Sequence, residues 1–152
     1  MLKTNKPKDH PIHTRYNQGI EGQYFLQSSI EKHLGESIVW TTCQTDTMDA
    51  ESKTYWIEIK RRLGTYHYSN KIIREEGWVI PVCKMERARQ EKKKTRFYYF
   101  WDSDQSLWYW EFNPTQLRDM MIKIPTNHRD NQPHYYIPQS FWKKVEMDCL
   151  ID

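Results

Sequence analysis

The 152-residue sequence contains little glycine and little cysteine. Its 5 glycines form no glycine-rich phosphate-binding loop, which argues against a kinase or a dinucleotide-binding domain. The 3 cysteines, Cys43, Cys83 and Cys149, are odd in number and lie far apart in the chain. This spacing argues against a disulfide framework and predicts a reducing intracellular compartment, either cytoplasmic or nuclear.

Long apolar runs and metal-binding histidine spacings are also lacking. No run approaches the roughly 20 apolar residues of a membrane-spanning helix, and the first residues lack the apolar core of a secretion signal. His10, His13, His128 and His134 do not follow the spacing of a zinc site, and no cysteine pair accompanies them. No local motif supports a Cys–His hydrolase either. The sequence therefore predicts neither a membrane segment nor a zinc centre.

Aromatic residues, in contrast, are abundant. They make up 14% of the chain, with 7 Trp and 10 Tyr, which predicts a folded protein with a sizeable core. The length fits one domain, and the formal net charge of +3 does not by itself indicate nucleic-acid binding. We expect an irregular basic arm over residues 1–15 and a single domain over residues 16–152.

The first half of that domain has the pattern of one helix followed by strands. Apolar residues recur at helical spacing from Asn17, a candidate cap, to Leu34, and Gly35 is a candidate stop. We expect strands over residues 37–42, 43–48 and 54–61, with a turn over 49–53. The second and third of these strands should form an antiparallel hairpin.

The second half alternates between helical and strand patterns. The expected helices cover residues 69–76, 84–94, 114–121 and 140–145. The expected strands cover residues 78–83, 96–101, 107–112 and 135–137. This alternation predicts an α/β (α+β) fold with a mixed central sheet flanked by helices.

The expected hairpin brings together residues that suit metal-dependent phosphodiester chemistry. With the turn centred on Ser52, Asp46 lies directly opposite Glu58, and directly paired residues share one face of a sheet. Lys60 is two residues from Glu58 and shares that face too. Asp49 has the opposite parity in this register and would need a bulge to join them. Two carboxylates can hold Mg²⁺ or Mn²⁺, and a lysine can orient or deprotonate the attacking water.

This arrangement resembles the PD-(D/E)XK nuclease superfamily over about residues 17–62. Gly19-Ile20-Glu21 matches the family's helix glutamate, Asp46 its strand aspartate, and Glu58-Ile59-Lys60 its Glu-x-Lys. The resemblance implies a restriction-endonuclease-like core in which Asp46, Glu58 and the Ile59 carbonyl hold the metal, with Glu21 completing the shell. Lys60 would then position water, while Asp49 remains a rival to Asp46.

The implied activity is a Mg²⁺- or Mn²⁺-dependent deoxyribonuclease, either endo- or exonucleolytic, with RNA left open as a substrate. A homodimer would supply the two sites that duplex or junction cleavage needs, although no residue indicates one. The resemblance also fits a viral or phage source.

Basic residues follow the predicted site in the chain and suit contacts with a phosphate backbone. The candidates are Arg61, Arg62, Lys84, Arg87, Lys92, Lys93 and Lys94. In similar nucleases a basic residue on the helix after the catalytic strands assists at the phosphate, and Lys84 fits that position. The alternative is that these charges form solvated strand ends and a solvated helix face.

Two other functions stay open from the sequence. One is a nuclease-like fold that binds nucleic acid without cleaving it, and the other is a protein-interaction module. The aromatic block over residues 97–101, with Trp108 and Trp110, would stack unpaired bases in the first case or form an interface in the second. Packing inside the core is the simpler interpretation of this block.

Overall fold

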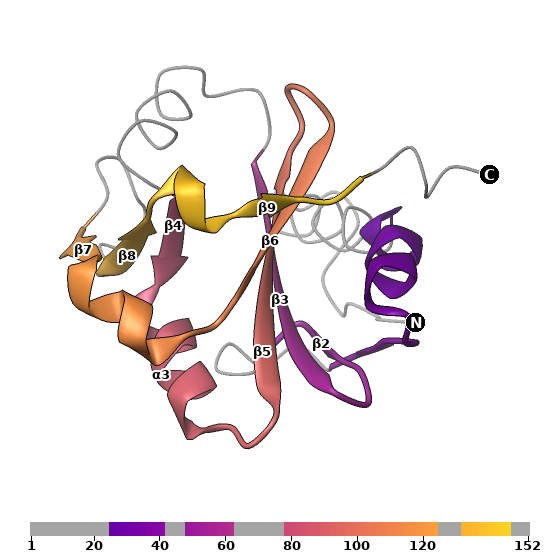
Figure 1. Ribbon diagram of the computed structural model, residues 1–152, viewed down its shortest axis with the longest axis horizontal. Helices are drawn as coiled ribbons and strands as arrows, with labels where there is room; N and C mark the ends of the chain where they lie inside the picture. The colour runs from indigo at the N-terminus through magenta and orange to yellow at the C-terminus, as the bar shows by residue number, and fades with distance from the viewer. Residues whose placement is uncertain (1–24, 42–47, 63–77, 125–131, 147–152) are drawn as a thin grey trace, which may run out of the picture.

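The protein forms two β-sheets, and helices pack on both faces of the larger sheet (Figure 1). The computed structural model describes residues 25–41, 48–62, 78–124 and 132–146. The central sheet has six strands in the order β1-β2-β3-β5-β6-β9, and the second sheet has three in the order β4-β8-β7. The predicted fold class, a mixed sheet with flanking helices, is therefore confirmed.

The elements alternate along the described chain. A helix over residues 25–34 comes first. It is followed by β1 (Val39–Trp40), β2 (Ala50–Glu51), β3 (Tyr55–Arg62), β4 (Trp78–Pro81), α3 (Val82–Gln90), β5 (Lys94–Trp101), β6 (Ser106–Glu111), the 3₁₀ helix η1 (Pro114–Asp119), β7 (Met121–Lys123), β8 (His134–Ile137), the 3₁₀ helix η2 (Gln139–Phe141) and β9 (Lys143–Lys144). Among the described residues, no helix has the length and apolar character needed to cross a membrane.

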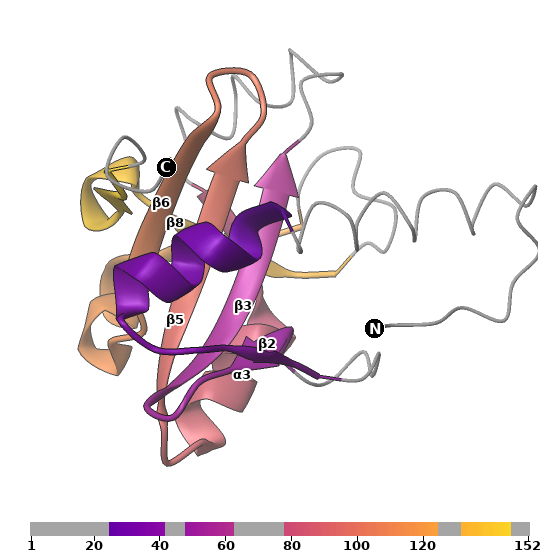
Figure 2. The ribbon, with the colours of Figure 1, turned by 90° about the vertical axis from the view of Figure 1, so that its right-hand side faces the viewer.

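The helix over residues 25–34 covers one face of the central sheet (Figure 2). Leu26 and Ile30 are fully buried and four residues apart, so they lie on the same side of the helix. They pack with Ile57 of β3 and with Tyr98 and Phe100 of β5. This apolar stripe explains why the segment is helical and why it docks on the sheet.

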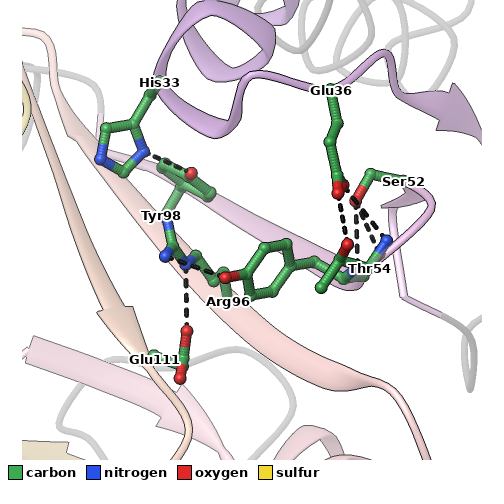
Figure 3. A network of polar contacts seen from close by, with 8 residues as sticks. His33, Glu36, Ser52, Thr54, Arg96, Tyr98 and Glu111 are labelled. Carbon is green, nitrogen blue, oxygen red and sulfur yellow. Dashed lines mark hydrogen bonds and ion pairs between the residues drawn. The ribbon is translucent and has the colours of Figure 1, made fainter.

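A polar network joins the same helix to the sheet (Figure 3). His33 Nδ1 lies 2.8 Å from the Tyr98 hydroxyl, and the two rings meet edge to face. The Arg96 guanidinium lies 4.4 Å from the centre of the Tyr55 ring and 4.9 Å from that of Tyr109. Burial raises the pKa of Tyr98 to about 12. The Tyr98 hydroxyl therefore stays protonated and fastens the helix to β5.

Gly35 ends this helix, as the sequence predicts. Its φ of +71° lies in the left-handed region, and its N–H donates to the Glu31 carbonyl at 2.8 Å. Gly35→Ala should lower the free energy of unfolding by about 1 kcal/mol, because a Cβ disfavours this φ. We expect the midpoint of thermal unfolding to fall by roughly 2–4 °C, measured by circular dichroism. Gly35→Asn should cost less, since asparagine tolerates this conformation, and equal losses would contradict the backbone explanation.

β3 separates the two cores of the molecule by strict alternation. Ile57 and Ile59 are buried on the side of the helix over residues 25–34. Trp56, Glu58 and Lys60 point to the opposite face, where α3 and the second sheet lie (Figure 1). β3 pairs in parallel with β5 along its whole length, so the chain crosses over through β4 and α3 between them.

The aromatic block forms core rather than a binding surface. Residues 97–101 of β5 are at most 1% exposed, and their side chains contribute to the cores on both faces of the sheet. Trp78 packs against Trp101, Trp108 and Trp142, with ring centres 5.2–5.3 Å apart. The core interpretation of residues 97–101 is confirmed, and these five rings are not available to stack on bases.

Several predicted boundaries were wrong. The helix expected over residues 84–94 is α3, which ends at Gln90, so Lys92, Lys93 and Lys94 follow it in a bend and in β5. The helix expected over 140–145 is the short η2 followed by β9. The turn expected over 49–53 contains β2. The predicted arm over residues 1–15 and the helix over 69–76 lie outside the described residues, as does nearly all of the strand over 43–48.

Candidate functional site

The hairpin of β2 and β3 brings two carboxylates together, although not the pair that the sequence predicts. Ala50 pairs with Ile57 and Glu51 with Trp56, so the predicted register that sets Asp46 opposite Glu58 was wrong. Continuing the observed pairing by one residue brings Asp49 opposite Glu58. The prediction that Asp49 would need a bulge to join this face depended on that register and was therefore wrong as well, and Asp46 lies outside the described residues.

A tight turn over Lys53 and Thr54 sets this register. The Ser52 N–H donates to the Tyr55 carbonyl at 2.8 Å, and the Ser52 hydroxyl accepts from the Tyr55 N–H at 3.0 Å. The Glu36 carboxylate, from the segment before β1, accepts hydrogen bonds from the Thr54 N–H and hydroxyl (Figure 3). These bonds lower the pKa of Glu36. The turn is thus centred after Ser52. Each residue of β2 therefore pairs with a residue further along β3 than predicted.

Asp49 is held by both its backbone and its side chain. Its carbonyl accepts from the Thr41 N–H and the Thr41 hydroxyl, each at 3.0 Å. One carboxylate oxygen, Oδ2, accepts from the Ile59 N–H of β3 at 2.8 Å. The Asp49 side chain also forms a hydrogen bond with that of Glu58. These bonds hold the Asp49 carboxylate beside Glu58.

Glu58 lies in a confined and strongly polar environment. Its side chain is 13% exposed, and Lys84 Nζ lies 3.4 Å from its Oε1 atom. Burial raises the pKa of Glu58 well above its usual range, and the Asp49 charge raises it further, while Lys84 opposes both effects. Oε1 is buried and accepts no hydrogen bond within the residues that the structure describes. A cation beside Glu58 and Asp49 would relieve both the desolvation and the repulsion.

The two predicted lysines come from different elements. Lys60 is half-buried and follows Glu58 on the same face of β3, where its parallel-strand partner is Tyr99. Lys84 lies in the first turn of α3 and reaches the carboxylates from above the sheet. Ile59, predicted to offer its carbonyl, lies between Glu58 and Lys60 in the sequence of β3, with its side chain buried on the opposite face, and its N–H donates to Asp49.

The donor set fits a hard divalent cation. Two carboxylates with one buried oxygen that lacks a hydrogen bond are ligands that Mg²⁺ and Mn²⁺ prefer. Among the described residues no group of three or more His, Cys, Asp or Glu could hold a metal. Glu21, the predicted third carboxylate, lies outside these residues, so Asp49 and Glu58 are the described carboxylates that could take part in such a site.

Besides Lys84, four of the predicted nucleic-acid contacts have partners within the protein. Arg61 forms a bidentate ion pair with Asp102 at 2.9 and 3.0 Å, and Arg62 donates to the Tyr99 hydroxyl at 3.0 Å. Arg87 pairs with Glu91 at 2.7 Å, one turn further along the chain.

Lys93 is the fourth of these predicted contacts that has a partner within the protein. It contacts Glu51 at 2.7 Å and the Ser52 carbonyl at 3.0 Å, which places it against the hairpin turn. Lys92 and Lys94 are exposed, whereas Lys84 belongs with the carboxylates. The predicted nucleic-acid contacts are therefore divided between residues with partners inside the protein and the exposed Lys92 and Lys94.

Sequence reasoning gave Asp49 only as a rival, yet a local signal for it existed. Ser52 and Tyr55 flank a two-residue turn, and a serine hydroxyl readily accepts from the backbone N–H that follows such a turn. A turn centred after Ser52 would have favoured Asp49 over Asp46. The contribution of Glu36 to this turn had no comparable sequence signal.

Comparison of the chain with protein-family models, with curated proteins and with solved structures finds no match.

Proposed function

We propose that this protein is a Mg²⁺- or Mn²⁺-dependent nuclease that hydrolyses phosphodiester bonds in DNA. The observation that carries the proposal is the contact between the Asp49 and Glu58 carboxylates, beside the Lys84 ammonium. Two like charges held together in a confined place cost stability unless a cation or a proton compensates them. Lys84 compensates part of this cost, and a bound divalent cation would compensate both carboxylates at once.

The connection of the elements supports the same proposal. A helix precedes an antiparallel arrangement of β1, β2 and β3, and the acids lie just before β2 and on β3. This order agrees with the helix, strand aspartate and Glu-x-Lys of the PD-(D/E)XK nucleases that the sequence resembles. A restriction-endonuclease-like core is therefore part of the proposal, with Asp49 in the position that the sequence predicts for Asp46.

Each residue has a distinct role in this proposal. Asp49 and Glu58 would hold the metal, and Glu21 remains a predicted third ligand. Bound there, the cation would supply charge stabilisation for the phosphate and for the attacking oxygen. Lys60, next on the face of β3, would orient the attacking water. Lys84 would balance the charge of Glu58 before DNA arrives and would then be placed to contact the phosphate.

The test is cleavage of a panel of DNA substrates by the full chain. Single strands, duplexes and branched junctions would each be incubated with Mg²⁺, with Mn²⁺ and with excess chelator. We expect cleavage that chelator abolishes and that added metal restores, and we expect Lys60→Ala to lack it. Lys93→Ala is the matched control, because Lys93 pairs with Glu51 at the hairpin turn and should keep near wild-type activity.

Two results would contradict the proposal. Cleavage by Lys60→Ala at the wild-type rate would show that the assigned residues are not the catalytic site. Tight, salt-sensitive DNA binding without cleavage under any metal condition would favour a nuclease-like fold that only binds.

A further inference from the structure

A pocket lies where the end of α3 meets η1 and β8, away from the Asp49 and Glu58 carboxylates. It has a volume of about 280 Å³ and is lined by Arg89, Pro114, Thr115, Leu117, Arg118 and Tyr135. Arg89 is close to the C-terminal end of α3, and Arg118 is in the last turn of η1. Two cations from separate elements therefore converge on one concave site. Its volume lies near the lower end of the range for small-molecule pockets.

The polar groups of this pocket are available to a ligand. Within the described part of the chain, Arg89 and Arg118 form neither an ion pair nor a hydrogen bond. This distinguishes Arg89 from its neighbour Arg87, which Glu91 neutralises. Tyr135 is 7% exposed, and its hydroxyl likewise has no hydrogen bond among the described residues. Both arginines are exposed and line the same pocket, so an anion in it could accept hydrogen bonds from both guanidinium groups.

The remaining surface of the pocket is apolar. Pro114 and the buried Leu117 lie on η1, and the ring of Tyr135 lies on β8. A simple inorganic anion would use the two arginines and leave this surface exposed to water. A ligand that joins a phosphate to a flat ring would use both parts, since the ring can pack on apolar and aromatic side chains.

We infer that this pocket binds a nucleoside phosphate, either as a free nucleotide or as the terminal nucleotide of a strand. Arg89 and Arg118 would hold the phosphate, with the planar donor geometry that guanidinium groups offer to phosphate oxygens. Pro114, Leu117 and Tyr135 would contact the sugar and base. Lys84 and Arg89 are five residues apart on α3, so the helix presents them on different sides, and the pocket is separate from the carboxylates. The binding itself does not depend on the proposed function.

Isothermal titration calorimetry of the full chain, without metal and at low salt, tests this inference. The probes are thymidine 5′-monophosphate, thymidine and inorganic phosphate. We expect the monophosphate to bind at least tenfold more tightly than either of the other two. Arg89→Gln and Arg118→Gln should each weaken its binding about tenfold, and Tyr135→Phe should weaken it less. Arg87→Gln, on the same helix, should change the affinity less than twofold.

Oligonucleotides distinguish the two sources of the ligand. A single strand with a 5′-phosphate would be compared with the same strand carrying a 5′-hydroxyl or a 3′-phosphate. Preference for one phosphorylated end would identify a strand terminus, whereas binding of the free monophosphate alone would identify a nucleotide.

Three results would overturn the inference. They are equal affinity for thymidine and its monophosphate, no effect of either arginine substitution in variants that unfold like the wild type, and no binding of the monophosphate at millimolar concentration. If metal-dependent cleavage were observed together with any of these three results, the nuclease proposal would be supported and the inference of a nucleotide pocket would be refuted.

Discussion

Asp49→Asn is expected to lower the cleavage rate by about 100-fold or more and to weaken Mn²⁺ binding to a similar degree. The carboxylate of Asp49 lies in contact with Glu58 and is positioned by the Ile59 N–H at 2.8 Å. Asparagine keeps the shape of the side chain but removes its charge, so any loss reports the ligand itself rather than the packing. Single-turnover cleavage and calorimetric titration with Mn²⁺ measure the two effects separately.

Asp46→Asn is the decisive comparison, because the sequence alone favours Asp46 as the metal ligand. We expect Asp46→Asn to retain most of the activity that Asp49→Asn loses. Asp119→Asn, an exposed aspartate on η1, controls for a general change of charge. The reverse outcome, with Asp46→Asn inactive and Asp49→Asn active, would make Asp49 a structural residue that only supports β3.

Glu58→Gln is expected to stabilise the metal-free protein at neutral pH while removing its activity. The Glu58 carboxyl is confined beside Asp49, and its pKa is raised by burial and then by the Asp49 charge. A neutral amide avoids both costs and can still donate a hydrogen bond to Asp49. We expect the free energy of unfolding to rise by about 1–2 kcal/mol, the usual range for relief of such a cost. Chemical unfolding in the presence of chelator measures this change.

The pH dependence gives this prediction a definite sign. The folded-state pKa of Glu58 lies above the unfolded value of about 4.5, so the folded protein binds more protons between these two pH values. The contribution of Glu58 to stability is therefore favourable at low pH and is lost as the pH rises through the folded pKa. The stability advantage of Glu58→Gln should consequently grow as the pH rises.

A matched substitution separates this effect from a general loss of charge. Glu86→Gln removes an exposed carboxylate from α3 and should change stability by less than about 0.5 kcal/mol at every pH. If Glu58→Gln were less stable than the wild type across the pH range, the carboxyl would be a stabilising group, and the argument for a cation at this site would weaken.

The carboxylate hairpin shows how far the sequence could predict this molecule. The β-forming residues over 54–61 correctly predicted a strand, which the structure has over residues 55–62, and the two-residue spacing of Glu58 and Lys60 correctly predicted their shared face. The register failed because the turn is fixed by side chains, namely the Ser52 hydroxyl and the Glu36 carboxylate, which lies 18 residues before Thr54. Hydrophobic pattern alone places a residue on a face but leaves its cross-strand partner open whenever the turn can shift.

The partners of the basic residues could not be predicted from the sequence for a different reason. The partner of Arg61 is Asp102, which is 41 residues away and reaches it because β3 and β5 are paired. The partner of Lys93, Glu51, likewise depends on the crossover through α3. Such neutralising contacts depend on topology, and no local spacing of charges can reveal them. Lys84, which the family resemblance suggested as a phosphate contact, lies 3.4 Å from Glu58 Oε1, and its role at a phosphate stays a prediction.

The parallel pairing of β3 with β5 also fixes the order in which the charges can meet during folding. Asp49 and Glu58 are nine residues apart, so a local hairpin suffices to bring them together. Lys84 joins them only when the long crossover closes, with Tyr55 meeting Lys94 across 39 residues. Local contacts form faster than distant ones, because closing a long loop costs more chain entropy. The two acids thus meet before their lysine partner arrives, and the folding chain bears their repulsion at its earliest stage.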